Sequence, residues 1–373
     1  MRSLLLLTSL AIFAMGLIMI FSTTSAEVLD LDLDKSTRQA LIRQLYYALI
    51  GMGLAGSITW LGYRRLLNLS PYLLLFFSFL LLLVLIPGVG KEVNGSRRWL
   101  SVAGFSFQPS EFVKYLIPVY VIHRILGFGK QIFEFKPFLK LALLATVPMF
   151  LILIEPNNGT AGVIGVTLTI VCLLTHVPFR FWALPLGILV IGGGLFAYHS
   201  PYVTARLKVY LNPELDLKGK GHQPYQAKIA AGSGQLFGKG PGNGLQKLSY
   251  LPEAQNDYIA AIYAEEFGFF GIFCLIMLYS LLGYCGYSIS LNCSERSGLL
   301  LAGCFTFLIC FQAFMNLGVV SGLLPSTGLN LPLFSQGGSS LMANASALGV
   351  LWDIARNKSS QINLLVDASG RNL

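Results

Sequence analysis

The stretch PYLLLFFSFLLLLVLIPGV, residues 71–89, contains no charged side chain. A helix that crosses the hydrocarbon core of a bilayer needs about 20 mostly apolar residues, and this stretch has that length and composition. Across the whole chain 54% of the residues are hydrophobic and only 12% are charged, whereas a soluble domain has about 25% charged residues. A surface so poor in charge is suited to lipid, so the sequence predicts a membrane protein.

Further apolar stretches on both sides predict the rest of the fold. We expect an all-α integral membrane protein, a single polytopic domain over residues 1–373, with ten transmembrane helices and a large extracytoplasmic loop, residues 199–257, between helices seven and eight. The eighth stretch is too long for one simple span, and we expect it to begin with a polar turn at the membrane surface. The predicted spans lie near residues 4–24, 41–61, 71–89, 110–127, 137–155, 159–176, 180–198, 258–288, 298–323 and 339–355.

The first stretch has two interpretations. Arg2, an apolar run from Leu4 to Phe21 and the pair Ser25-Ala26 would serve as the charged region, core and cleavage site of a signal peptide. The apolar run has 18 residues, which is longer than the usual core of about 7–15. This length favours a helix that is retained.

Basic residues in alternate short loops set the predicted orientation, because cytoplasmic loops carry an excess of Lys and Arg. Such residues follow every second span, so both termini are expected in the cytoplasm. The outer side also carries basic residues, within 90–109 and 199–257. Lipid headgroups or a phosphate-bearing ligand would each account for them, and the net charge of +9 selects neither. The loop residues are Arg64, Arg65, Arg124, Lys130, Lys136, Lys140, Arg180, Arg296, Arg356 and Lys358.

The first cluster of polar residues precedes and enters the fourth span. Arg98 could clamp a phosphate while the neighbouring Trp99 ring stacks on a sugar or a lipid stem. Glu111 and Lys114 are three residues apart, so both lie on one helix face. Ionisable residues at membrane depth are costly and are usually paired or functional. A structural salt bridge between these two explains them equally well.

The segment KLSYLPEAQNDY, residues 247–258, holds the cluster that matters most. Glu253 and Asp257 are four residues apart and share one face if the segment is helical. A carboxylate at the mouth of the bilayer could take a proton from a sugar hydroxyl as a general base, or ligate Mg²⁺ shared with a diphosphate. The structural alternative is a carboxylate placed at a helix start because the helix dipole favours it there.

Three other segments on the outer side are rich in turn residues. Residues 155–160, EPNNGT, suit either a functional turn or simple capping. Glycines between 219 and 244 would let backbone amides approach an anion closely. Residues 325–340, PSTGLNLPLFSQGGSS, suggest a re-entrant segment, which is tolerated when it is buried in protein or lines a wet cavity. Ser339 and Ser340 begin the last span and could bind an anion or cap the helix.

Other chemistries are not indicated. The chain has no P-loop, dinucleotide fingerprint, HExxH motif or Ser-His-Asp order, and its four histidines are scattered. Its six cysteines lack the spacing of a zinc site or a disulfide framework. We therefore expect no organic cofactor and no nucleic acid partner.

Four segments, in order, resemble the motifs of the SEDS peptidoglycan polymerases. They are Gly95 to Leu100 followed by Gln108 to Lys114, then residues 155–160, 247–257 and 325–340. The resemblance covers the chain from about residue 40 to 355. The wording around Gly242 to Lys247 is most similar to the cell-division branch, FtsW, and its sporulation relative.

The resemblance implies ten transmembrane helices and polymerisation of lipid II outside the membrane. Asp257 would be the general base that activates the acceptor GlcNAc 4-hydroxyl, which attacks the donor MurNAc anomeric carbon with inversion while undecaprenyl diphosphate leaves. A divalent cation, Mg²⁺ or Mn²⁺, could bind at Asp257. The residues that would hold substrate are Arg98, Trp99, Glu111, Lys114, Arg206, Lys247, Glu253, Ser339 and Ser340.

The resemblance also implies partners and a location. A class B penicillin-binding transpeptidase and divisome membrane proteins are the expected partners, in the bacterial inner membrane at the division septum. Two other functions stay open: a lipid II flippase and a non-catalytic divisome scaffold. A flippase needs a cavity that opens to both sides, whereas the motifs here lie on one face, which favours an outer-face enzyme.

The chain departs from the family pattern at five positions. Asn157 stands where the family usually has Asp, so a charged role for residues 155–160 is in doubt. Gln255 and Asn256 replace His-Thr before Asp257. The remaining two departures are Asn330 for a frequent Thr and Gln336 for the usual Tyr.

Overall fold

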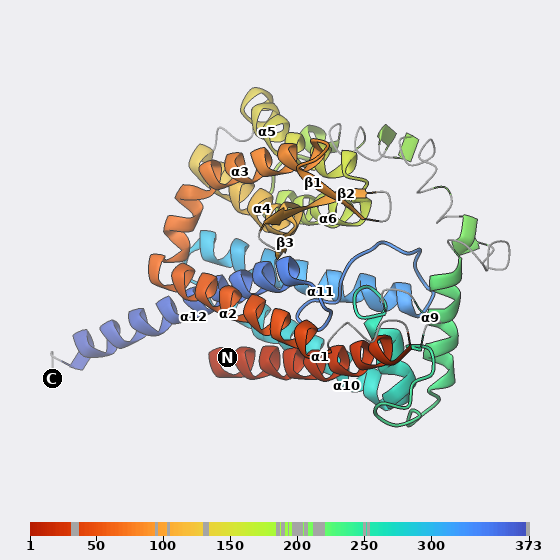
Figure 1. The fold of residues 1–373 in the computed structure, drawn as a ribbon. Coiled ribbons are helices and arrows are strands. Elements are labelled where there is room, and N and C mark those ends of the chain that lie inside the picture. The colour runs from red at the N-terminus through yellow and green to blue at the C-terminus, as the bar shows by residue number, and fades with distance from the viewer. Residues whose placement is uncertain are drawn as a thin grey trace.

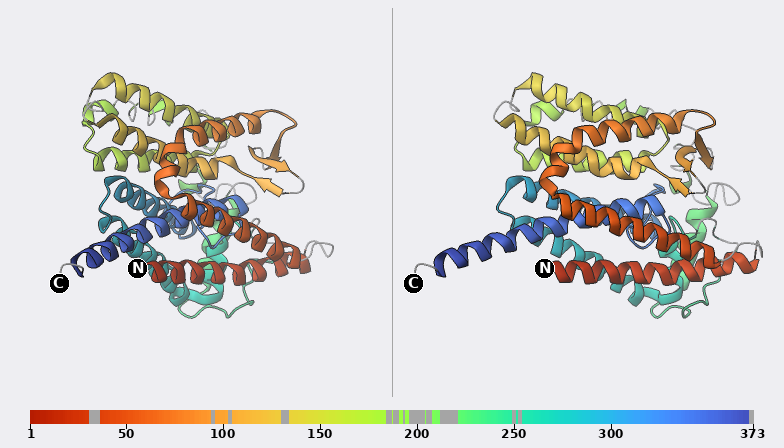
Figure 2. Two further views of the ribbon diagram at one scale, coloured as in Figure 1. Left: turned by 90° about the vertical axis from the view of Figure 1, so that its left-hand side faces the viewer. Right: turned by 60° about the vertical axis from the view of Figure 1, so that its left-hand side comes forward.

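The computed structural model is mostly helical, with helices that run side by side (Figures 1 and 2). It describes residues 1–30, 37–93, 96–102, 105–129, 134–183, 187, 191–192, 194–195, 204, 208–211, 221–248, 251 and 254–370. The helices are α1 (Arg2–Asp30), α2 (Thr37–Leu61), α3 (Tyr63–Leu85), α4 (Pro109–Phe128), α5 (Phe135–Ile154), α6 (Asn158–Leu174), α9 (His222–Ser233), α10 (Ile259–Leu291), α11 (Arg296–Val320) and α12 (Gly338–Gly370).

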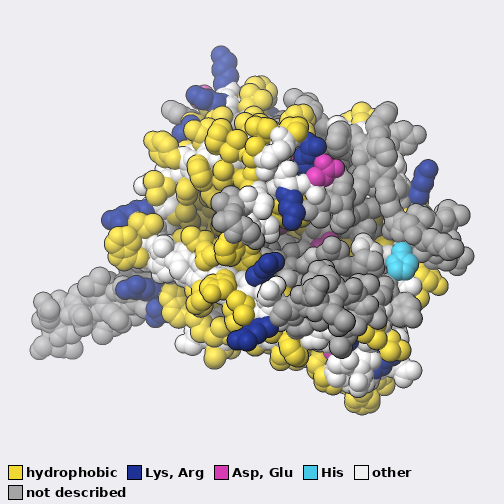
Figure 3. All heavy atoms as spheres, in the orientation of Figure 1, with side chains coloured by type: hydrophobic (Ala, Val, Ile, Leu, Met, Phe, Trp, Pro, Cys, Tyr) yellow, Lys and Arg dark blue, Asp and Glu magenta, His cyan; other side chains and the backbone are white. Residues whose placement is uncertain are grey.

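Six helices within the described ranges are long and apolar enough to cross a membrane: α1, α2, α3, α5, α10 and α11. Helix α6 is apolar but shorter. Helices α4 and α12 match the predicted spans 110–127 and 339–355, while most of the predicted span 180–198 lies outside the described residues. The protein is thus a multi-pass membrane protein, and the count of ten spans stays a prediction. Hydrophobic side chains cover much of the coloured surface in Figure 3, as lipid contact requires.

The all-α expectation is wrong at residues 90–107. Three strands within this range form an antiparallel sheet in the order β1 (Gly90–Val93), β2 (Ser96–Val102) and β3 (Phe105–Phe107). Leu100 on β2 lies opposite Phe107 on β3.

The burial of β2 explains why this segment is a strand. Ser96, Arg98 and Leu100 are buried, whereas Arg97 and Trp99 are half-buried. This alternation has the two-residue period of a strand with one face against the protein. The sheet packs on α3 and α4 and turns Arg98 inward.

The bundle has two groups of helices, seen one above the other in Figure 1. Helices α3, α4, α5 and α6 contact one another in the upper group, and α1, α2, α10, α11 and α12 form the lower group. Helix α4 joins the groups through contacts with α11 and α12.

Small residues bring α2 and α12 together closely. Gly51 and Ala55 lie four residues apart on α2, opposite Ala345 and Gly349 on α12. A Cβ atom at Gly349 would lie 2.8 Å from the Ala55 Cα. Such small-residue faces are typical of packing between membrane helices.

Helix α1 is fastened to the rest of the bundle. A Cβ atom at Gly16 would lie 2.5 Å from the Phe334 carbonyl oxygen. The Ser22 hydroxyl donates to the Glu266 carboxylate over 2.9 Å. These contacts give the first helix a structural role in the bundle, and its retention stays a prediction.

Helix α10 bends at Gly268, which has φ 66° and ψ −162°. The segment Ile259 to Phe267 therefore runs apart from the rest of α10. The sequence predicted that this stretch was too long for one simple span, and the structure divides it at this glycine. The bend separates the short part of α10 that follows Asp257 from the longer part that ends at Leu291.

Candidate functional site

A buried ion pair lies at the start of α4. The Lys114 ammonium donates to Glu111 Oε2 over 2.6 Å and to Gln312 Oε1 of α11 over 2.7 Å. Only 1% of the Lys114 side chain and 10% of the Glu111 side chain are exposed. The spacing of three residues predicted that the two share a face, and the structure pairs them.

Two amide side chains of α11 extend this pair toward Asp257. Gln312 Nε2 donates to the Asn330 carbonyl over 2.8 Å. Asn316 Nδ2 donates to the Leu329 carbonyl over 2.7 Å and to the Asp257 carbonyl over 2.8 Å. Gln312 and Asn316 are four residues apart and therefore share a face of α11.

Asp257 lies just before the start of α10, and the residue is half-buried. Asn316 Nδ2 holds its backbone carbonyl, and the backbone N–H of Gln336 donates to the carbonyl of nearby Gln255 over 3.0 Å. The main chain around the predicted general base is thus held from both α11 and the segment 325–340.

The segment 325–340 is non-helical up to Gly337 and is largely buried. Leu329, Leu331 and Phe334 are among its buried side chains. Side chains of the surrounding helices satisfy its carbonyl groups; the Tyr279 hydroxyl, for example, donates to the Pro332 carbonyl. This is the situation in which irregular backbone is tolerated at membrane depth.

Ser339 and Ser340, at the start of α12, are both buried. The Gln108 amide donates to Ser339 Oγ over 2.8 Å. Asn344 Nδ2 donates to Ser340 Oγ over 3.2 Å. Both hydroxyls therefore take part in internal hydrogen bonds, and their binding of an anion stays a prediction.

Arg98 connects the sheet to the turn between α5 and α6. Its Nε donates to the Glu155 carbonyl over 3.0 Å, and its terminal nitrogen donates to the Pro156 carbonyl. Asn157 Nδ2 donates to Ser110 Oγ over 3.2 Å. The guanidinium that was predicted to clamp a phosphate thus holds the turn 155–157, while Trp99, the next residue on β2, is half-buried on the opposite face of the strand.

The Glu155 carboxyl group is buried without a hydrogen-bond partner among the described residues. Burial raises its pKa to about 9, and the nearby positive charge of Arg98 offsets only part of this effect. The group is therefore neutral at pH 7. The turn carries neither a charged Glu155 nor, because residue 157 is asparagine, a charged residue at that position.

The predicted substrate residue Lys247 lies in a buried ion pair instead. Its ammonium donates to Glu266 Oε1 over 2.6 Å and to Ser22 Oγ over 2.7 Å. Lys239 pairs with Glu265 over 2.6 Å. The position of Lys247 is therefore explained by the internal carboxylates, and a contact with substrate stays untested.

The glycine-rich loop does cradle anions, but these belong to the protein. The backbone amides of Leu245 and Gln246 donate to Glu265, over 3.0 and 3.1 Å. The amide of Gly242 donates to Glu266 over 3.0 Å. The sequence predicted that backbone amides of this loop approach an anion closely. It did not identify two carboxylates of α10 as that anion.

Arg206 and Glu253, two further predicted substrate residues, lie outside the described residues. Within the described ranges, no group of three or more His, Cys, Asp or Glu side chains could hold a metal ion. A divalent cation at Asp257 stays a prediction; Mg²⁺ is commonly held by one or two carboxylates together with substrate phosphates and water.

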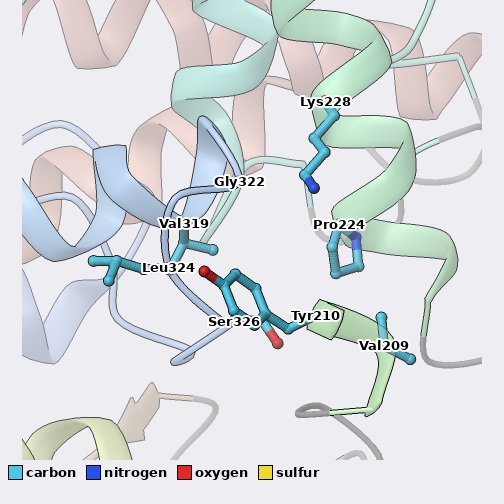
Figure 4. A pocket seen from close by; sticks show the side chains of 8 residues that line it. All are labelled: Val209, Tyr210, Pro224, Lys228, Val319, Gly322, Leu324 and Ser326. Carbon is cyan, nitrogen blue, oxygen red and sulfur yellow. The ribbon is translucent and has the colours of Figure 1, made fainter. Parts of the chain in front are cut away.

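A small cavity lies at the C-terminal end of α11, beside α9 (Figure 4). The Tyr210 ring lies in it, and the Tyr210 hydroxyl donates to the Leu323 carbonyl over 2.9 Å. The Lys228 side chain extends from α9 toward Gly322. The cavity borders Ser326 and so adjoins the segment 325–340, but it lies apart from the Glu111–Lys114 pair.

Sequence reasoning missed Gln312 and Asn316. Each bridges elements that are remote in the chain, so no local pattern revealed its partners. The signal that could have found them is the presence of two amides four residues apart in an otherwise apolar span, because polar groups at membrane depth need partners.

Comparison with known proteins places these motifs in one family. Residues 2–360 match the family of FtsW, RodA and SpoVE, described as cell cycle proteins. The probable peptidoglycan glycosyltransferase FtsW of Alcanivorax borkumensis is 38% identical over 355 residues, which cover 93% of this chain and 91% of the relative. Stage V sporulation protein E of Bacillus subtilis is also 38% identical, with 95% of this chain and 96% of that protein covered.

Solved structures agree with the sequence relatives. One chain of a peptidoglycan synthase complex, described as coordinating polymerization and crosslinking, has a TM-score of 0.75 and 28% identity and covers 95% of this chain and 97% of its own. The rod shape determining protein RodA of Thermus thermophilus has a TM-score of 0.68 and 28% identity, with coverage of 95% and 96%. The chain therefore belongs to the FtsW/RodA/SpoVE family of cell cycle proteins.

Proposed function

We propose that this protein is a peptidoglycan glycosyltransferase that polymerises lipid II into glycan strands during septal cell-wall synthesis. The observation that carries the proposal is a network of hydrogen bonds that joins three of the four sequence motifs. Asp257 is linked through Asn316 to the segment 325–340, and that segment is linked through Gln312 to the Glu111–Lys114 pair. The names of the relatives support the same activity.

The proposed reaction is a single inverting displacement. The Asp257 carboxylate takes the proton of the acceptor GlcNAc 4-hydroxyl as a general base. The acceptor oxygen forms a bond to the donor MurNAc anomeric carbon while the bond from that carbon to the diphosphate oxygen breaks. Undecaprenyl diphosphate leaves with the bonding electrons. The fixed backbone on both sides of Asp257 would hold its carboxylate in place for this step.

Asp257 also fits a divalent cation, Mg²⁺ or Mn²⁺, that is shared with the substrate. Magnesium is commonly held by one or two protein carboxylates together with substrate phosphates and water. Such a cation would neutralise negative charge that builds up on the leaving diphosphate. Asp257 would be its protein ligand.

The other predicted substrate residues fall into groups according to the contacts that they make within the protein. Glu111, Lys114, Arg98 and Lys247 have internal hydrogen bonds or ion pairs, so we assign them to holding the shape of the site. The half-buried Trp99 ring is the one best suited to stack on a sugar or a lipid stem. The proposed contacts of Arg206, Glu253, Ser339 and Ser340 with substrate rest on the family resemblance.

We further propose a class B penicillin-binding transpeptidase as partner, together with divisome membrane proteins. The structural similarity to a chain of a peptidoglycan synthase complex supports a partner of this kind. The proposed location is the bacterial inner membrane at the division septum, with both termini in the cytoplasm. The basic residues of the alternate short loops support this orientation.

The test uses purified protein, labelled lipid II and Mg²⁺ or Mn²⁺, with and without a cognate transpeptidase. Formation of glycan polymer is the expected result. Movement of lipid II across liposome membranes without polymer would support a flippase. If the protein raised only the activity of the transpeptidase and made no polymer in any arm, it would be a scaffold.

A further inference from the structure

A glycine-rich loop, residues 234–245, lies against the bend of α10. In sequence it belongs to the large outer loop, yet it packs beside a membrane span. Phe237 at its tip contacts Phe270, with ring centroids 5.2 Å apart. Phe270 is two residues past the bend at Gly268 and lies within the stretch of α10 that is long and apolar enough to cross the membrane. The loop tip therefore lies beside the apolar span, at the part of α10 that follows the bend.

The backbone of the loop and the bend of α10 satisfy each other's hydrogen bonds. The amides of Lys239 and Gly240 donate to the carbonyls of Glu265 and Glu266, over 2.9 and 3.0 Å. In the other direction, the amides of Phe269 and Phe270, which the bend leaves without helical partners, donate to the carbonyls of Gln235 and Leu236. Irregular backbone next to lipid requires such internal pairing, because hydrocarbon offers no hydrogen bonds.

The close fit requires glycine on both sides. Gly238 has φ 79°, and a Cβ atom there would lie 2.1 Å from the Glu266 carbonyl oxygen. A Cβ atom at Gly268 would lie 2.3 Å from the Gly238 nitrogen. The two glycines thus allow main chain to lie on main chain, which leaves the apolar side chains of the loop free to point away.

The loop 234–245 and the adjoining first part of α10 together form a module, and the charges of this module are neutralised inside it. Glu265 and Glu266 are completely or almost completely buried, and they pair with Lys239 and Lys247. Ser22 of α1 donates to Glu266 and accepts from Lys247. The module therefore presents little unpaired charge of its own near the membrane, which lowers the cost of placing it next to lipid.

The outward surface of the module is apolar and continuous with α10. At the tip of the loop, 78% of Phe237 is exposed. Hydrophobic side chains gather along the lower edge of Figure 3, where Figure 1 places α10. The exposed side chains that form this surface are Leu236, Phe237, Leu245, Phe269, Phe270 and Phe273.

We propose that residues 234–245 form an interfacial anchor whose tip, Leu236 and Phe237, inserts among the lipid chains of the outer leaflet. The occupant of the apolar surface is lipid, because the surface continues the lipid-facing side of a membrane span and its backbone needs no other partner. Interfacial segments of this kind insert about 5–10 Å below the headgroups. The anchor fixes the loop, α1 and the first part of α10 at one depth, independently of the reaction that the protein catalyses.

The test places tryptophan at the tip, as Phe237→Trp and, in a second variant, Leu236→Trp. The full chain is reconstituted in nanodiscs that contain phosphatidylcholine brominated either near the headgroup or near the chain end. The quenching of each variant is compared with that of the unchanged chain, which contains four tryptophans. Lys91→Trp, on the exposed outer sheet, is the water-facing control, and Phe76→Trp, exposed on the span α3, is the lipid-facing control.

Insertion to that depth predicts that bromine near the headgroup quenches the tip tryptophan more strongly than bromine near the chain end. Lys91→Trp should be quenched by aqueous iodide and little by bromine at either depth. Tip variants that behave like Lys91→Trp would place the loop in water and overturn the proposal. Protection of the tip from both bromine and iodide would show that protein covers it, which would also overturn the proposal.

Discussion

Replacing Lys114 with methionine should strongly destabilise the protein while keeping the volume of the side chain. The ammonium group makes two contacts, at 2.6 Å to Glu111 and at 2.7 Å to Gln312. The change leaves the Glu111 carboxylate with 10% of its side chain exposed and without its ion-pair partner. Removing one partner of a buried ion pair typically costs about 3–5 kcal/mol, so the folded-to-unfolded ratio should fall by a factor of about a hundred to a few thousand.

The double variant Glu111→Gln/Lys114→Met separates charge from packing. It removes both charges and leaves one Gln312 hydrogen bond unmade, for which about 1–3 kcal/mol is the usual cost. The double variant should therefore be more stable than Lys114→Met alone. This order of stability would not arise if Lys114 acted only by filling space.

Denaturant titration in mixed detergent micelles measures the free energy of unfolding of four proteins: the unchanged chain, Glu111→Gln, Lys114→Met and the double variant. Phe76→Leu, on the lipid-facing side of α3, is the control and should change the free energy of unfolding little. A loss below about 1 kcal/mol for Lys114→Met would be typical of an exposed ion pair. That result, or simple additivity of the two single changes, would refute the reasoning.

Three further changes test other contacts of the site. Asn316→Leu should lower polymer formation much more than Asn292→Ala, a change at an exposed asparagine, because the Asn316 side chain donates to the Asp257 carbonyl. Equal activity of the two variants in the lipid II assay would contradict this. Glu155→Gln should keep activity at pH 7 and should make the free energy of unfolding less dependent on pH. Because burial raises the Glu155 pKa from about 4.5 to about 9, the unchanged protein loses stability as pH rises between these values. A variant that shows the same loss would contradict the assignment. Gly268→Ala should prevent recovery of monodisperse protein, since its Cβ would lie 2.3 Å from the Gly238 nitrogen, whereas Gly53→Ala on α2 meets nothing within 4 Å and should behave normally in size-exclusion chromatography.

The membrane spans were predictable because their signal is composition alone. Residues 71–89 have no charge, and the observed α3 covers most of them. Its start at Tyr63 was missed because Arg64 and Arg65 were assigned to a cytoplasmic loop, whereas both lie in the first turn of α3. The short strands were also missed, because three to seven residues between two apolar spans give too little alternation to detect.

The site was predictable where the relevant spacing is local. Glu111 and Lys114 are one helical turn apart, so their pairing follows from the sequence. The partners of Lys247 and Asp257 were not predictable in this way. Lys247 meets Glu266 only because α10 bends at Gly268, and Asp257 meets Asn316 only because α11 packs beside the outer segment.

The glycine-rich loop shows how a correct physical rule can be applied to the wrong partner. Its glycines do bring backbone amides to carboxylate oxygens, but the carboxylates are those of Glu265 and Glu266. The sequence contained both parts, yet nothing local related residues 234–245 to a helix that begins at Ile259. Long-range packing decided the assignment.

The Asp257 carboxylate is the group on which the proposed reaction depends. The most direct measurement compares polymerisation of labelled lipid II by the unchanged protein and by Asp257→Asn, each purified with the same transpeptidase. The amide keeps the size of the side chain, but it cannot take a proton from the acceptor hydroxyl. No polymer from the Asn variant, with unchanged unfolding free energy, is the predicted result, whereas polymer at the rate of the unchanged protein would contradict the account.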